Sequence, residues 1–332
     1  MTSAPQGGAA PRAAKDGGAG AAPASGRWSF FLAVLRTRPQ FALGYGIVLL
    51  ITLLAIFAPL IAPFDPEQAN PSAFLQPPGW PYIMGTDATG LDIFSRVIYA
   101  PRIDLAIALA GTVVSAVIGS ILGAVAGYYE TKRGLGRMVS GFIMRSSDVI
   151  QAFPVFVFAI AVVAVLGQSL HSIVLAVAFV NAPIYLRLMR SQVLSVRRLR
   201  YVEAAYIAGT SDLGILTRHV IPNAMAPVLA QLSVNIGWAI LLTAALSFIG
   251  AGVEAPTPEW GSMIAMGYQN IITGHWWPSI FPGLALALTI FGFSLVGASV
   301  EVLADPVRRG RMAGEIRDRR SRKAVAAASG RA

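Results

Sequence analysis

The chain has 332 residues, of which 55% are hydrophobic and only 13% charged, and its formal net charge at pH 7 is +10. Soluble domains carry about a quarter charged residues, so this composition, with its long apolar runs, indicates an integral membrane protein. The absence of cysteine excludes disulfides and cysteine-based metal sites.

Residues 1–26 are rich in Ala, Gly, Pro and Ser without apolar periodicity, which predicts a disordered cytoplasmic tail. A membrane span needs about 20 mostly apolar residues. The sequence predicts six spans, at about 41–62, 103–127, 139–166, 170–189, 228–251 and 283–303, within a transmembrane domain over residues 27–306. Residues 307–332 are predicted to form a basic cytoplasmic tail.

The 26 Lys and Arg residues are concentrated in alternate connections. Five precede the first span, three lie between the second and third, six lie at and beyond the end of the fourth, and nine lie in the C-terminal tail. The loop between the fifth and sixth spans has none. Basic connections mark the cytoplasmic side, so both termini are predicted to be cytoplasmic. This distribution explains the positive net charge without requiring that the protein binds nucleic acid. We expect the tails to lie near membrane lipid.

Small residues recur at every fourth position of the second predicted span. The stripe consists of Gly111, Ser115, Gly119, Gly123 and Gly127. Such a stripe lets another helix backbone approach closely. We therefore predict a helix-packing or pathway role, with the partner helix in this chain or in a second subunit.

The third predicted span carries two charges, Arg145 and Asp148, three residues apart. This spacing places them on one helix face and predicts a structural charge pair, with a role in gating or subunit contact as the alternative. Pro154 should kink this span. Near the last span, the pair Trp276–Trp277 is typical of interfacial anchors, with ligand stacking as the alternative. The three histidines are scattered and predict no metal site.

The largest predicted cytoplasmic connection spans residues 190–227. Residues 201–208 favour a helix, and Gly209 should end it. Thr210 or Ser211 can cap a second helix with Asp212 in its first turn, and Pro222 is predicted to end that helix. The result would be two short amphipathic helices. Tethering to membrane spans at both ends argues against a DNA-binding unit.

This segment resembles a known motif. Glu203-Ala204-Ala205, three further residues, Gly209 and the closing Ile221-Pro222-Asn223 resemble the EAA loop of bacterial ATP-binding-cassette (ABC) importer permeases. His219 stands where the general pattern has Ile, and peptide-type members often show H-x-x-P-N at this point.

Three other stretches agree. "MGTDATGLDIFSRVIYAPRIDL" (84–105) resembles "LGTDxxGRDxxSRxxxGxRxSL" of the C-type permease subunit for dipeptides, oligopeptides or nickel, although Leu91 replaces the usual Arg and Ala100-Pro101 the usual Gly-Ala. "RSSDVIQAFP" (145–154) resembles "RxxDxxxAFP", and "LSFIGAGVEAPTPEWGSMI" (246–264) resembles "LSFLGLGVQPPTPEWGxM". The final "LRDxLDPR" is matched only near Leu303 and at Asp305-Pro306. The resemblance covers about residues 30–309.

The resemblance implies an all-α integral membrane protein with six transmembrane helices, the type I ABC importer permease fold, and cytoplasmic coupling (EAA) helices that dock into a groove of an ATPase subunit. It assigns ATPase coupling to Glu203, Ala204, Ala205, Gly209, Thr210, Ser211 and Asp212. The implied partners are a second homologous permease subunit, two cytoplasmic ATPase subunits and an extracytoplasmic solute-binding protein, in the bacterial cytoplasmic (inner) membrane.

The chain itself is expected to be non-catalytic and to bind no cofactor. None of its three lysines completes a phosphate-binding G-x-x-x-x-G-K-[ST] loop, so ATP and Mg²⁺ would bind to the partner ATPase subunits. Di- or oligopeptides are the expected solute, with nickel, opines, glutathione and oligosaccharides as alternatives. A self-contained secondary transporter is a rival hypothesis, but it would need ionisable groups at mid-membrane, and Asp148 and Glu301 lie near span ends. A membrane scaffold would need an added soluble domain.

Overall fold

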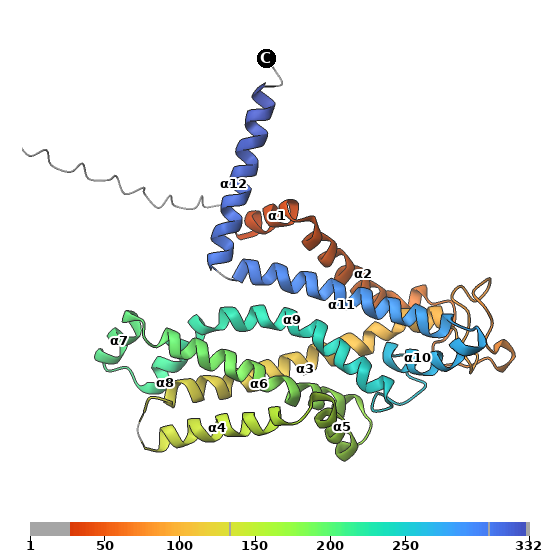
Figure 1. The fold of residues 1–332 in the computed structure, drawn as a ribbon, viewed down its shortest axis with the longest axis horizontal. Helices are drawn as coiled ribbons and strands as arrows, with labels where there is room; N and C mark the ends of the chain where they lie inside the picture. The colour runs from red at the N-terminus through yellow and green to blue at the C-terminus, as the bar shows by residue number, and fades with distance from the viewer. Residues whose placement is uncertain (1–26, 133, 305, 330–332) are drawn as a thin grey trace, which may run out of the picture.

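The structure is a computed structural model that describes residues 27–132, 134–304 and 306–329. Helices and the turns between them make up this part of the chain, and its one β-contact is an isolated bridge between Thr86 and Asp92. The predicted disordered tail, residues 1–26, lies outside the described residues. The long helices run side by side along one direction and form an elongated bundle (Figure 1).

Five helical stretches in the described part are long and apolar enough to cross a membrane. Their main helices are α2 (Pro39–Ile61), α3 (Ile93–Tyr129), α6 (Leu170–Val196), α9 (Ile221–Phe248) and α11 (Trp277–Ala304). The third predicted span, residues 139–166, is not one straight helix. It consists of α4 (Leu135–Ala152) and α5 (Val155–Leu166), which are bent by 97° and count as one span only if taken together.

Pro154 accounts for this break. The ring of a proline pushes the preceding residue out of the helical region, and Phe153 has an extended backbone with ψ of 140°. Pro154 then starts α5 as its N-cap residue. The predicted kink is therefore a complete interruption rather than a bend within a continuous helix.

α3 begins ten residues earlier than the predicted span at residue 103. Asp92 caps it by accepting a hydrogen bond from the Ser95 amide over 2.8 Å. Arg96 in its first turn is 1% exposed, and its Nη1 donates to the carbonyl oxygens of Pro66 and Pro256. A charged residue expected in a loop is thus buried in the helix, because distant backbone carbonyls pair with it.

The small-residue stripe of α3 packs against α6 of the same chain. A methyl group added to Gly111 would lie 2.7 Å from Val177, and one added to Gly127 would lie 2.8 Å from the Arg190 carbonyl oxygen. Gly119 and Gly123 are equally close to the α6 backbone. The two helices can approach this closely because the stripe has no larger side chain.

Trp276 and Trp277 behave differently from the predicted pair of interfacial anchors. Trp276 is half-exposed, but Trp277 is buried, and its Nε1 donates to the Thr86 carbonyl oxygen over 3.0 Å. Trp277 therefore joins the loop before α3 to the start of α11, because a buried indole N–H requires an acceptor. These loops lie at the end of the bundle opposite α7 (Arg200–Ile207) (Figure 1).

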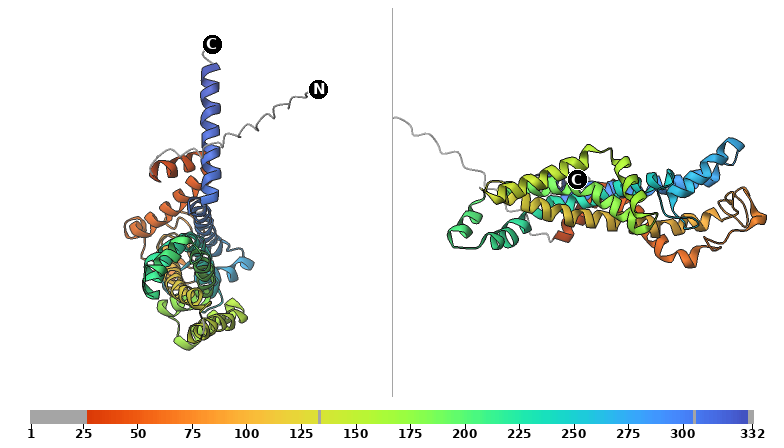
Figure 2. Two further views of the ribbon diagram at one scale, coloured as in Figure 1. Left: turned by 90° about the vertical axis from the view of Figure 1, so that its left-hand side faces the viewer. Right: turned by 90° about the horizontal axis from the view of Figure 1, so that it is seen from below.

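Most of the predicted basic tail folds as α12 (Pro306–Ser329), and the chain before the first span folds as α1 (Arg27–Thr37). The start of α12 packs against α1 and the start of α2, where Met312 is buried with Val34 of α1 and Phe41 of α2. α12 runs across the direction of the long helices in both views from the side and along the bundle (Figures 1 and 2).

Candidate functional site

The predicted EAA segment forms a helical protrusion at one end of the bundle (Figure 1). It consists of α7 (Arg200–Ile207), a tight turn and α8 (Asp212–Gly214), and we call residues 200–214 the end segment. Its inner side is held by Val202, which is buried together with Ile215 and Leu216 in an apolar cluster between α3, α6 and α9. The end segment is thus packed against the membrane-crossing helices and is not a loose loop.

Gly209 ends α7 as predicted, and the geometry gives the reason. Its φ is +79°, a left-handed conformation that residues with a side chain rarely adopt. The Gly209 amide donates to the Tyr206 carbonyl and the Thr210 amide donates to the Ala205 carbonyl, over 3.0 and 3.1 Å. These two bonds form a Schellman motif, which satisfies carbonyls at the end of α7.

The second helix starts at Ser211, whose Oγ accepts from the Gly214 amide over 3.3 Å. The prediction that Pro222 ends this helix is wrong. After α8 the chain passes through a π-helical turn, Ile215–Val220, directly into α9. Pro222 lies in the first turn of α9, where its missing N–H is not needed, and the wider π-turn before it relieves the backbone clash.

The outer surface of the end segment combines a carboxylate with exposed apolar side chains. Glu203 is exposed, and so are Tyr206, Ile207 and Leu213, with Ile207 79% accessible. Ala204 and Ala205 have short side chains, so no bulky group stands on the surface beside Glu203. Exposed apolar side chains gathered at a protruding end are typical of a protein–protein contact.

Asp212 connects the end segment to α3. Its carboxylate forms an ion pair with Lys132 and accepts a hydrogen bond from the Tyr128 hydroxyl over 2.8 Å. Lys132 lies just beyond the last turn of α3, and Tyr128 lies within that turn. Any movement of α8 therefore acts directly on the end of a membrane-crossing helix.

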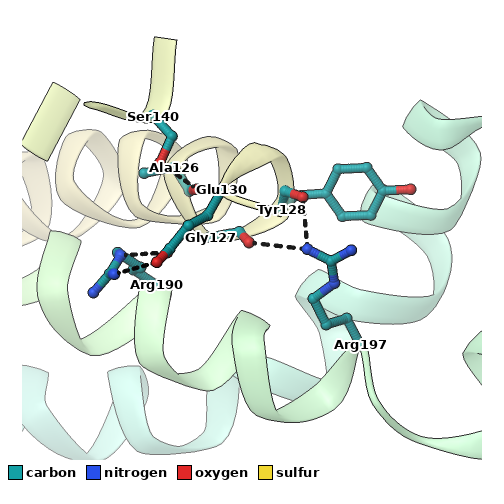
Figure 3. A network of polar contacts seen from close by, with 7 residues as sticks. All are labelled: Ala126, Gly127, Tyr128, Glu130, Ser140, Arg190 and Arg197. Carbon is teal, nitrogen blue, oxygen red and sulfur yellow. Dashed lines mark hydrogen bonds and ion pairs between the residues drawn. The ribbon is translucent and has the colours of Figure 1, made fainter. Parts of the chain in front are cut away.

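The same end of α3 is bonded to α6 and α4 (Figure 3). Arg190 makes a two-pronged contact with Glu130 at 2.7 and 2.8 Å. Arg197 Nη1 donates to the Tyr128 carbonyl over 2.9 Å, and Ser140 Oγ donates to the Ala126 carbonyl over 2.9 Å. The last carbonyls of a helix lack partners within it, so these bonds complete the α3 terminus.

We call these side chains the anchor network: Tyr128, Glu130, Lys132, Arg190, Arg197 and Asp212. Sequence reasoning missed it as a unit, since Lys132, Arg190 and Arg197 had served only to assign topology. Two signals were available in the sequence. Glu130 is the one acidic residue in a basic connection, and Arg190 and Arg197 are seven apart, which places them on one face of α6.

The predicted pair between Arg145 and Asp148 is replaced by another. Asp148 pairs with Arg187 of α6 over 2.8 Å, while Arg145 is exposed on α4. Both candidate arginines are near Asp148 in the fold, but α4 packs against α6, and the side chain reaching across the interface makes the contact. The charge therefore joins two helices instead of stabilising one.

Comparisons with known proteins support the resemblance. Residues 102–309 match the family model described as binding-protein-dependent transport system inner membrane component, and residues 26–78 match the N-terminal transmembrane domain of oligopeptide transport permease C. The chain is 39% identical to the dipeptide transport system permease protein of Alkalihalophilus pseudofirmus, over 79% of this chain and 84% of the relative.

Two other relatives are similar over comparable lengths. The probable D,D-dipeptide transport system permease protein of Escherichia coli is 37% identical over 84% of this chain and 91% of the relative. The di/tripeptide transport system permease protein of Pseudomonas aeruginosa is 38% identical over 79% of this chain and 86% of the relative.

Proposed function

The chain belongs to the family of binding-protein-dependent transport system inner membrane components, and from this premise we propose that it forms half of the membrane pathway of an ATP-driven importer of di- or oligopeptides. The observation that carries the proposal is the family match across residues 102–309, which contains most of the membrane bundle and the whole end segment. The peptide class rests on the names of the relatives, all three of which are peptide permeases.

The end segment would be the contact with a cytoplasmic ATPase. Glu203, Ala204 and Ala205 would lie against that subunit, and the turn from Gly209 to Asp212 would fix the angle between α7 and α8. The exposed apolar side chains at Tyr206, Ile207 and Leu213 support this assignment, because they have a shape and polarity suited to a groove on another protein.

The anchor network would connect this contact to the membrane-crossing helices. Closure of the ATPases would displace the end segment, and the bonds from Asp212 to Tyr128 and Lys132 would carry the displacement to α3. Arg190, bonded to Glu130, would carry α6 with it. The pathway would thus change access by rigid-body movement of packed helices, driven by ligand binding to another chain.

The remaining subunits follow from this role. A second, homologous permease would complete the pathway, and a solute-binding protein would deliver the peptide at the end opposite the end segment. The basic residues near the end segment and the termini support a cytoplasmic location for both. ATP and Mg²⁺ would bind to the ATPase subunits, and this chain would carry no catalytic group of its own.

Reconstitution tests this function. The chain is assembled in liposomes with the permease, ATPase and binding-protein subunits encoded with it, and ATP-dependent uptake is measured for labelled dipeptides and tetrapeptides, Ni²⁺ and glutathione. We expect saturable peptide uptake that requires the binding protein. Uptake confined to Ni²⁺ or glutathione would transfer the proposal to that solute, and uptake without the ATPases would contradict an ATP-driven role.

A further inference from the structure

α12 is a basic helix that crosses the direction of the membrane-crossing helices. The membrane-crossing helices define the bundle direction, and α12 runs across it in both side and end views (Figures 1 and 2). α11 ends at Ala304 and α12 begins at Pro306, so the change of direction occurs where the chain leaves its last span. A helix in this position lies along the membrane surface.

Contacts with α1 and the start of α2 fix this orientation. Met312 is buried against Val34 and Phe41, and Arg38 pairs with Glu315 over 3.0 Å. The guanidinium of Arg309 lies 5.0 Å from the centre of the Phe30 ring. The first turns of α12 are therefore docked on α1 and the start of α2 through apolar, ionic and cation–π contacts, and the helix is not a loose tail.

α1 itself has features of an interfacial helix. Trp28 is 72% exposed, and Leu32, four residues later, is exposed on the same face. The Trp28 ring contacts Phe31, which meets Tyr45 of α2 edge to face at 5.3 Å. Trp and Tyr rings concentrate at the level of lipid head groups, so this aromatic group indicates the depth at which α1 lies.

The charge of α12 suits an anionic surface. Its sequence contains seven Arg and one Lys against Glu315 and Asp318, a net charge of +6 (8 − 2). Glu315 is already paired with Arg38, while Arg311 and Arg317 are exposed. Arginine binds phosphate groups through two parallel hydrogen bonds, and basic segments next to a span are attracted to anionic lipid.

We propose that α12 binds the anionic phospholipid head groups of the leaflet at which α11 ends, with α1 as the interfacial support that holds it there. An acidic surface of a neighbouring protein is the competing partner. The geometry favours lipid, because α12 lies across the end of the bundle while the end segment extends further along the bundle axis (Figure 1). This inference is independent of the transported solute.

The test uses the absence of cysteine in the native chain. Ser321→Cys introduces a single, exposed attachment site on α12 for a nitroxide spin label. The importer complex is placed in nanodiscs of phosphatidylcholine alone or with about one third phosphatidylglycerol. Two properties of the spin label are then measured: its rotational mobility and its collision rates with oxygen and with a water-soluble nickel chelate. Together they distinguish α12 bound to the membrane surface from α12 detached from it. Thr131→Cys, in the exposed connection after α3, is the matched label control.

We expect surface-bound label at position 321 only with phosphatidylglycerol, and its release at about 1 M salt, where charges are screened within about 3 Å. Arg311→Gln and Arg317→Gln should each lower the ratio of bound to detached label about fivefold, and Lys at either position should restore it. Arg102→Gln, in the first half of α3 and away from α12, should have no effect.

Two results would overturn the proposal. One is an identical distribution of the label in neutral and anionic nanodiscs. The other is immobilisation in neutral nanodiscs that appears only when the ATPase subunits are added, which would assign the basic face of α12 to an acidic protein surface.

Discussion

The Tyr128 hydroxyl donates a hydrogen bond to the Asp212 carboxylate over 2.8 Å, which joins the last turn of α3 to the first residue of α8. The two residues are 84 positions apart in the sequence. This bond and the adjacent ion pair with Lys132 connect a surface helix to a membrane-crossing helix without an intervening loop. The effect on coupling that we propose for them can be tested separately from their effect on folding.

Tyr128→Phe should reduce coupling while leaving the bundle assembled. The substitution removes only the hydroxyl, and hydrogen bonds to charged groups contribute about 1.5–3 kcal/mol, which partial exposure lowers to about 1 kcal/mol. We expect about a fivefold loss in peptide transported per ATP hydrolysed. Tyr129→Phe is the matched control, because that ring lies beside Tyr128 but its hydroxyl takes no part in the anchor network. Equal coupling in both variants would show that the bond to Asp212 carries no movement.

Gly209→Ala should distort the turn between α7 and α8. The added methyl group would meet no atom within 4 Å, so the cost comes from the left-handed φ of +79° alone and is about 1 kcal/mol. Gly274→Ala is the matched control, since Gly274 also has a left-handed backbone, with φ of +87°, and equally open surroundings before α11. Both variants should lose similar thermal stability, and only the first should lower substrate-stimulated ATPase activity. Unchanged stimulation in Gly209→Ala would remove the turn from the coupling site.

Ile207→Asp should weaken binding of the ATPase without unfolding the chain. Ile207 is 79% exposed at the end segment, so a charge there costs little in the isolated subunit but is desolvated in a protein interface. Ile272→Asp is the control, because Ile272 is 94% exposed in the loops at the opposite end. Co-purification of the ATPase, measured as its ratio to the permease, should fall about tenfold or more for the first variant only.

Gly123→Ala should destabilise the bundle, whereas Gly46→Ala should not. A methyl group at Gly123 would collide with the backbone of Leu186 on α6, and overpacking of this kind costs about 1–3 kcal/mol. Gly46 lies in α2 with no atom within 4 Å of the new methyl group, so alanine there should be neutral or stabilising. Thermal unfolding in detergent distinguishes the two. A lower melting temperature for Gly46→Ala than for Gly123→Ala would contradict the packing of α3 on α6.

The predicted spans agree with the observed helices where hydropathy alone defines the position of the helix, as at α2 and α11. The prediction failed at the start of α3, because Arg96 marks a loop unless its carbonyl partners, Pro66 and Pro256, are known to lie nearby. Both are distant in sequence, and no local pattern encodes their approach. The partner of Asp148 was missed for the same reason, since Arg187 belongs to another helix.

Glycine and proline residues predicted the ends of helices with different success. Gly209 indicates a left-handed turn wherever it follows a helix, and the position of that turn was predicted correctly. Pro222 is compatible with the end of one helix or the start of the next, and the sequence alone does not distinguish them. Pro154 predicted a kink, but the complete break and the 97° angle between α4 and α5 depend on packing against the other helices.

The uninterrupted passage from α8 through the π-helical turn into α9 makes residues 212–248 one lever. At a rise of 1.5 Å per residue, its 37 residues measure about 55 Å from end to end. A tilt of about 5° around the midpoint would shift each tip by about 2 Å in opposite directions. If the end segment is the ATPase contact, as we propose, pressure on Leu213 at one end of this lever would displace Phe248 at the other end, on the opposite face of the membrane.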